Sequence, residues 1–259
     1  MLLPDLSAAL AALFYLALGG MKWFLGRRSE AISNFEAVVD VLAHLLILQL
    51  VFSIADTVAT AAGIRVSLGS PEFVSERLNA SASVFWEASQ TAVSTILYVQ
   101  TERAVLAAAP LTSPLSSVLG AATGWSTTEL SIVAIFFMHL SFATRVFSTI
   151  APFLVSIGSV LLPVPKIRRL GASLLAIYLS TSIAVIYGGS VTEKTVEKIK
   201  VPSPINPLDW VNIAGLTSDI AISLGQCATI VAVALALSIA AGYGMTSVFD
   251  SIYVTMVRA

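Results

Sequence analysis

Five long apolar runs follow one another along the chain, at residues 2–24, 37–62, 130–162 and 170–187 and from residue 213 towards the C-terminus. A helix needs roughly 20 apolar residues to cross the hydrocarbon core of a bilayer, which is about 30 Å thick. The number and length of the runs predict an all-α fold, a polytopic helical membrane protein with five to six transmembrane helices. We therefore expect a multi-pass protein of the cell membrane.

The central run, residues 129–170, is too long for one simple span and carries Arg145 near its middle. About 35 residues of helix rise roughly 50 Å, which exceeds the thickness of the hydrocarbon core. Pro152 removes one helix hydrogen bond, so it is the predicted kink of this long central helix. A charge at membrane depth is costly, and Arg145 is therefore expected to face protein or water.

The small and polar residues of the central run share one stripe on a helical projection: Ser141, Arg145, Ser148, Thr149, Pro152, Ser156 and Ser159. The opposite side is expected to face lipid and carries Phe136, Phe147, Phe153, Val155, Val160 and Leu162. The stripe has two interpretations. It is either a packing face, where small side chains and hydroxyls bring helices together, or the lining of a water-filled path.

Residues 80–109 have a helical pattern but are too polar for a helix surrounded by lipid. One stripe carries Ser83, Glu87, Gln90, Ser94, Tyr98 and Thr101, and it ends at Glu102 and Arg103. Three placements compete: an amphipathic helix on the outer surface, a segment that re-enters the membrane, and a crossing whose polar stripe faces a lumen. Glu87, Gln90 and Ser94 are accordingly further candidate pore-lining residues.

Basic clusters set the expected topology through the positive-inside rule. Lys22, Arg27 and Arg28 follow the first run, which we interpret as a retained helix with the N-terminus outside. Lys166, Arg168 and Arg169 form a basic turn that is expected to be cytoplasmic. A full crossing by residues 80–109 would move this turn outside, so we favour five spans in which that segment does not cross. Six spans result if the central run is two elements.

The expected organisation is one integral membrane domain, residues 1–259, in four consecutive parts. These are a helical hairpin (1–64), an external loop (65–128) that contains the polar helix, the central helix with the span after it (129–190), and an external loop with a long C-terminal helix (191–259). Residues 110–127 are expected to be a loop, and the sequon Asn79-Ala80-Ser81 falls on the predicted outer side.

Two ridges of small residues at four-residue spacing predict close helix packing. The first ridge consists of Ala172, Ala176, Ser180, Ala184 and Gly188, and the second of Ala228, Ala232, Ala236, Ala240 and Gly244.

Composition excludes several classes of protein. Of the 259 residues, 57% are hydrophobic and 11% are charged, which is unlike a soluble domain. The formal net charge of −1 provides no basic field for nucleic acid. The two histidines and one cysteine form no metal-ligand spacing, and no nucleophile elbow, phosphate loop or dinucleotide motif is present. We therefore expect no enzyme, no cofactor and no bound metal.

Residues 136–187 resemble the central region of the polytopic membrane subunit of type IV secretion and conjugation machines, in particular the CedA-like proteins of crenarchaeal DNA import. The residues that carry the resemblance are Thr144-Arg145, Ala151-Pro152, Gly158, Leu162-Pro163-Val164-Pro165, Arg168-Arg169 and Gly171. The specific part of the resemblance covers about a fifth of the chain.

The resemblance implies a homo-oligomeric subunit of a DNA-translocation channel between archaeal cells. It also implies single-stranded DNA as cargo, a traffic ATPase at the cytoplasmic basic turn, and small pilin-like membrane proteins as partners. Two alternatives stay open: a small-solute or ion transporter that uses Asp40, Asp56 and Arg145, and a non-catalytic membrane scaffold of a larger secretion or pilus complex.

Overall fold

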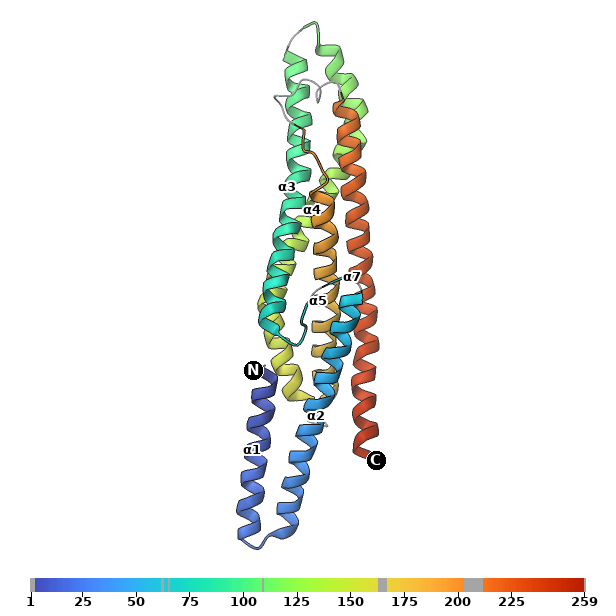
Figure 1. Cartoon of the computed structure of the whole chain (residues 1–259). Coiled ribbons are helices and arrows are strands. Elements are labelled where there is room, and N and C mark those ends of the chain that lie inside the picture. The colour runs from blue at the N-terminus through green and yellow to red at the C-terminus, as the bar shows by residue number, and fades with distance from the viewer. Residues whose placement is uncertain are drawn as a thin grey trace. The chain divides into compact units, whose positions relative to one another are not determined.

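The computed structural model describes residues 3–61, 63–64, 66–108, 110–162, 167–202 and 212–258, and these residues fold almost entirely as helices (Figure 1). The helices are α1 (Leu3–Phe24), α2 (Arg28–Ala61), α3 (Pro71–Ala108), α4 (Ser113–Leu161), α5 (Arg168–Val196) and α7 (Ile213–Arg258). No strand occurs in these ranges. The predicted all-α fold is confirmed for this part of the chain.

Four of the described helices are long and apolar enough to cross a membrane: α2, α4, α5 and the part Ile213–Val248 of α7. The described apolar part of α1, Ala12–Phe24, is shorter. α3 is not one of the four, in keeping with the polar composition that set it apart in the sequence. The structure therefore supports a helical membrane protein, and the predicted five to six spans remain a prediction.

Two helices begin earlier than the sequence predicts. α3 starts at Pro71, so most of the predicted loop before residue 80 is helical and the sequon at Asn79 lies within a helix. α4 starts at Ser113, so the predicted loop 110–127 is largely helix as well. Both errors have the same cause. Proline, serine and glycine were interpreted as loop formers, whereas proline is well tolerated in the first turn of a helix.

The chain divides into two compact units, and several helices contribute to both. Unit 1 consists of Met1–Arg77, Ser148–Ile183 and Leu237–Ala259. Unit 2 consists of Leu78–Phe147 and Ala184–Ala236. Unit 2 therefore holds most of α3, the first part of α4, the end of α5 and the beginning of α7.

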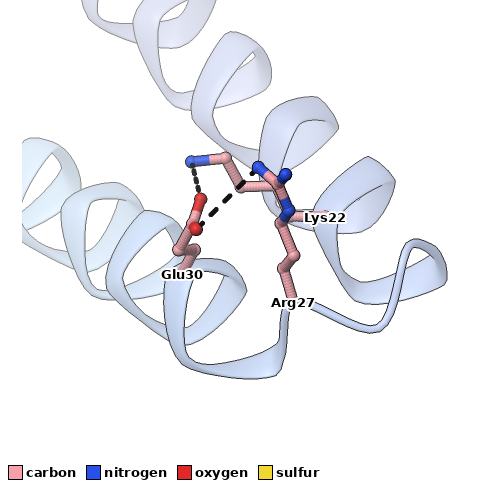
Figure 2. Close-up of polar contacts among 3 residues, drawn as sticks. All are labelled: Lys22, Arg27 and Glu30. Atoms are coloured by element: carbon pink, nitrogen blue, oxygen red, sulfur yellow. Dashed lines mark ion pairs between the residues drawn. The ribbon is translucent and has the colours of Figure 1, made fainter.

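In unit 1, α1 and α2 form an antiparallel hairpin. Gly26 adopts a φ of 79°, and the Arg27 and Gly26 N–H groups donate to the Lys22 and Trp23 carbonyls at 3.0 and 3.1 Å. This is the Schellman arrangement that ends a helix at a left-handed glycine. Figure 2 shows the Glu30 carboxylate beside Lys22 Nζ, at 3.2 Å, and Arg27 Nη1, at 4.0 Å. These exposed ion pairs contribute at most about 1 kcal/mol.

The turn between α4 and α5, also in unit 1, brings two backbones into close contact at a pair of glycines. A Cβ on Gly171 would lie 2.8 Å from the Gly158 carbonyl oxygen and 2.8 Å from the Leu162 nitrogen. A Cβ on Gly158 would lie 2.8 Å from Leu175 Cγ. Arg168 is buried, and its Nε donates to the Leu162 carbonyl at 3.4 Å. The positive charge of Arg168 interacts favourably with the partial negative charge at the C-terminal end of α4.

Pro152 lies inside α4, and its missing N–H leaves the Ser148 carbonyl without its usual helix donor. Ser75, in the first turns of α3, compensates for this loss. Its hydroxyl donates to the Ser148 carbonyl at 3.0 Å, and both residues belong to unit 1. The bond therefore satisfies a buried carbonyl and joins α3 to α4.

The two ridges of small residues have different outcomes. The α5 ridge is buried along its whole length, so its predicted role in close packing is confirmed. The α7 ridge does not pack within the chain, because Ala228 is half-buried and Ala232, Ala236, Ala240 and Gly244 are exposed. α7 packs instead through a line three and four residues apart, which includes Leu224, Cys227, Val231, Ser238 and Gly242.

Replacing Ser75 with alanine should lower stability by about 0.5–2 kcal/mol, because the Ser148 carbonyl loses its compensating donor. In a Pro152→Ala background the loss should be smaller, since an alanine at this position supplies the missing helix N–H. The measurement is a double-mutant cycle by thermal unfolding of the detergent-solubilised chain. Strictly additive losses would contradict the compensation.

Gly171→Ala should destabilise the chain by about 1–3 kcal/mol, because the new methyl meets backbone atoms that have no flexible side chain to give way. Gly124→Ala is the matched control. It lies within α4, a Cβ there meets nothing within 4 Å, and alanine has the better helix propensity. Unfolding in detergent measures both changes, and equal melting temperatures for the two variants would contradict this packing.

Candidate functional site

α3 and α4 are joined in unit 2 by two reciprocal hydrogen bonds. The Ser89 hydroxyl of α3 donates to the Ala134 carbonyl of α4 at 3.0 Å, and the Ser141 hydroxyl of α4 donates to the Ala82 carbonyl of α3 at 2.7 Å. All four residues are buried. The two bonds are separated by the same spacing on each helix, about two turns, as the 3.6-residue repeat requires.

Aromatic rings fill the space between the two hydrogen bonds. Phe85 and Phe137 stack with their centroids 6.0 Å apart, and neither side chain is exposed. Trp86 and Phe142 meet edge-on at 5.9 Å nearer the surface. A Cβ on Gly188 of α5 would lie 3.5 Å from Phe85, so α5 also packs closely against this region. These contacts fix the rotation of α3 about its own axis.

This rotation leaves the polar stripe of α3 on the surface. Ser83, Glu87, Gln90, Ser94 and Thr101 are exposed. Tyr98 was predicted to belong to the stripe, and that detail is wrong. Its ring is buried in a small cluster with Val99 and Ile213. Each step of four residues advances about 40° around the helix, so Tyr98 has moved from the exposed side to the packed side. Without Tyr98, the exposed stripe of α3 is polar, whereas the exposed sides of the apolar helices carry mainly large aliphatic residues.

The stripe predicted on α4 does not form one surface. Ser141 and Ser148 are buried, Arg145 and Thr149 are exposed, and Pro152, Ser156 and Ser159 are half-buried. The Ser156 hydroxyl donates to the Pro152 carbonyl at 2.9 Å. Steps of four residues advance about 40° around a helix, so a four-residue stripe drifts from a buried face to an exposed one. Ser141 thus acts as a brace between α3 and α4.

The same drift corrects the predicted lipid side of α4. Phe153 and Val160 are 63% and 54% exposed, as that prediction requires. Val155 and Leu162 are fully or almost fully buried, so their assignment to the lipid side is wrong. The buried line alternates steps of three and four residues and includes Thr144, Ser148, Ala151, Val155 and Leu162.

The basic turn is less accessible than the sequence suggests. Lys166 lies outside the described residues. Arg168 is 8% exposed and is held by the Leu162 carbonyl, so its guanidinium serves the turn between α4 and α5. Arg169 is exposed. In the described part of this turn, Arg169 is therefore the basic side chain that is accessible on the surface.

The far end of α3 packs against the beginning of α4 in unit 2. A Cβ on Gly120 would lie 2.7 Å from Arg103 Nη2, and the Ser116 hydroxyl donates to the Arg103 carbonyl at 3.1 Å. Glu102 is 4% exposed, and this burial raises the pKa of its carboxyl group. The Arg103 side chain fills the space that a Cβ at Gly120 would need, which explains the glycine at this position of α4.

Two open grooves were not anticipated from the sequence, although some of their residues were noted. One, in unit 1, has a volume of about 950 Å³ and contains Asp56 and Gln49. The other, in unit 2, has a volume of about 510 Å³ and contains Trp125, Glu129 and Gln226. A Cβ on Gly225 would lie 2.6 Å from Glu129 Oε1, so this glycine makes room for the carboxylate. Within the described residues, no group of three or more potential metal-binding side chains occurs.

The chain matches no protein-family model, no curated protein and no solved structure.

Cysteines introduced at Gln90 and Ser94 should react quickly with a charged, membrane-impermeant maleimide, because both positions are exposed on a polar face. Cysteines at Ser89 and Thr95, on the buried face of α3, should react at least tenfold more slowly. Ile132→Cys on α4 provides a control for a position that is exposed but lies on an apolar helix, which we expect to face lipid. Labelling in intact membranes measures all five rates, and a Gln90 variant as slow as the Ile132 variant would place this stripe in lipid.

Proposed function

We propose that this protein is a membrane-embedded subunit of an oligomeric DNA-translocation channel. The observation that carries the proposal is the exposed polar face of α3 on a chain whose other long helices expose mainly aliphatic side chains. Polar groups at membrane depth need water or protein around them. Several copies arranged with α3 towards a common centre would satisfy that need.

The charges near the path favour weak binding of the cargo. Glu72, Glu76 and Glu87 are exposed on α3, together with the basic Arg77. Such a surface holds phosphates loosely, and loosely held DNA can slide, whereas many phosphate contacts would retain it. Arg145 on α4 is exposed and supplies a positive charge, which we assign to lining or bracing the path.

DNA as the cargo comes from the resemblance to the CedA-like subunits of conjugation machines. In this proposal single-stranded DNA passes inward, a traffic ATPase docks at the cytoplasmic turn through Arg169, and small pilin-like membrane proteins complete the assembly. The N-terminus is outside, α1, α2, α4, α5 and α7 cross the membrane, and α3 contributes the polar wall.

The buried hydroxyls favour a defined wall over a flexible one. Ser89 and Ser141 hold α3 to α4 from both sides, so the polar face cannot rotate towards lipid without breaking two buried hydrogen bonds. The exposed α7 ridge of small residues offers a surface on which another copy can approach closely.

Arg145→Glu should abolish DNA exchange between cells, while membrane insertion and expression stay at the wild-type level. Lys198→Glu is the matched control, because it reverses an exposed charge in the turn that follows α5. Transfer of a genetic marker between strains measures the exchange. We expect at least a tenfold loss for the Arg145 variant and less than a twofold change for the Lys198 variant.

Unchanged exchange in the Arg145 variant would remove this residue from the proposed path. Flux of a small solute or ion in proteoliposomes, without DNA transfer, would favour the transporter alternative. Asp40 and Asp56 lie about 24 Å apart along α2, so a transporter site would use one of them. A stripe of α3 that no water-soluble reagent reaches would favour the scaffold alternative.

A further inference from the structure

The helical conformation is interrupted between α2 and α3, within unit 1. At this break the backbone of Leu68 forms hydrogen bonds with side chains of α2 and α5. The Leu68 N–H donates to Asp56 Oδ1 of α2 at 2.6 Å, and the Tyr178 hydroxyl of α5 donates to the Leu68 carbonyl at 2.8 Å. Leu68 itself is fully buried. Both polar groups of one peptide residue are thus satisfied by side chains from two helices.

α5 gives the surroundings of this break. Its uncharged stretch runs from Leu170 to Thr192 and spans about 33 Å. Tyr178 lies about 12 Å along that stretch from Leu170. Because its hydroxyl contacts the Leu68 carbonyl, and the Leu68 N–H contacts Asp56, the Asp56 carboxylate lies beside the uncharged stretch of α5.

The end of α2 is negatively polarised at the same place. Gly63, with a φ of 80°, ends the helix, and the Gly63 and Ile64 N–H groups donate to the Thr60 and Ala59 carbonyls, both at 2.9 Å. The C-terminal end of a helix carries a partial negative charge. Asp56 adds a full carboxylate, which among the described residues takes one hydrogen bond and no ion pair.

The groove of unit 1 is lined by Asp56 and by other residues with side-chain oxygens. Its polar lining residues are Gln49, Ser53, Asp56, Thr57, Thr60, Ser67 and Ser70. The hydroxyls of Thr57 and Thr60 each donate to a helix carbonyl at 2.8 Å, to Ser53 and Asp56 respectively. Because their hydrogens are committed to those carbonyls, these oxygens present lone pairs to the groove.

From these observations we propose that the groove at the break between α2 and α3 binds a monovalent cation, with Asp56 as its charged ligand. A discontinuous helix whose end and unwound backbone face a cavity is a typical place for an ion within a membrane protein. One carboxylate and one monovalent cation together leave no net charge, which lowers the cost of holding the half-buried carboxylate beside apolar helices. A divalent ion such as Ca²⁺ prefers more carboxylate ligands than this groove offers.

Cation binding does not depend on the proposed DNA transfer, so an experiment can contradict one of the two proposals and leave the other standing. A protein that transfers DNA without binding a cation keeps the proposed function and loses this inference. A protein that binds the cation without transferring DNA does the reverse.

The test is Na⁺ binding by the full-length chain in detergent, with the sodium salt replaced by N-methylglucamine at constant ionic strength. Sodium should raise the melting temperature by about 2–6 °C in a saturable way, and radioactive Na⁺ should bind with a stoichiometry near one. Asp56→Asn should lose both effects while keeping an oxygen that accepts from the Leu68 N–H. Asp40→Asn is the matched control, because Asp40 is an exposed aspartate on the same helix outside the groove.

Asp56→Glu provides a second variant if the asparagine variant does not fold. It keeps the negative charge but moves the carboxylate, so it should weaken Na⁺ binding by at least tenfold without abolishing it. The absence of saturable Na⁺ binding in the wild-type chain would overturn the proposal. Equal loss in the Asp40 and Asp56 variants would overturn it as well, because a diffuse surface charge would then explain the effect.

Discussion

A hydroxyl that donates to a backbone carbonyl on a neighbouring helix is the interaction on which much of this architecture depends. Ser89 and Ser141 make such bonds in opposite directions between α3 and α4, and Ser75 makes a third to Ser148. In an apolar environment, van der Waals packing and hydrogen bonds are the main forces between helices. Serine adds little bulk, so it permits close approach and supplies a directional bond at the same contact.

This interaction explains why a helix with so many polar residues has a defined orientation. α3 has buried serines and threonines on its packed face as well as polar residues on its exposed face. Hydrophobicity alone distinguishes the two faces poorly. The paired carbonyls and the stacked Phe85 and Phe137 select one rotation, and that rotation makes Glu87 and Gln90 a surface feature.

The sequence predicted the helical class, the α5 ridge and the polar side of α3, because each depends on spacing along one helix. It did not distinguish the α5 ridge from the α7 ridge, since both have small residues every four positions. The difference is made by the neighbours: Gly188 meets Val231 and Phe85, whereas a Cβ on Gly244 meets nothing within 4 Å. Likewise, the groove at Asp56 depends on Leu68 and Tyr178, which are far apart in the sequence and show no joint pattern.

The residues that carry the resemblance to conjugation subunits separate into two groups. Gly158, Arg168 and Gly171 shape the turn between α4 and α5, and Thr144 and Ala151 are buried in helix contacts. Another helical membrane protein with the same turn would need similar residues, whatever it transports. Arg145 differs because its side chain is exposed on α4, and Arg169 is also exposed, beside the turn. Substitutions at these two exposed arginines therefore test the proposed function, whereas substitutions at the glycines of the turn test the fold.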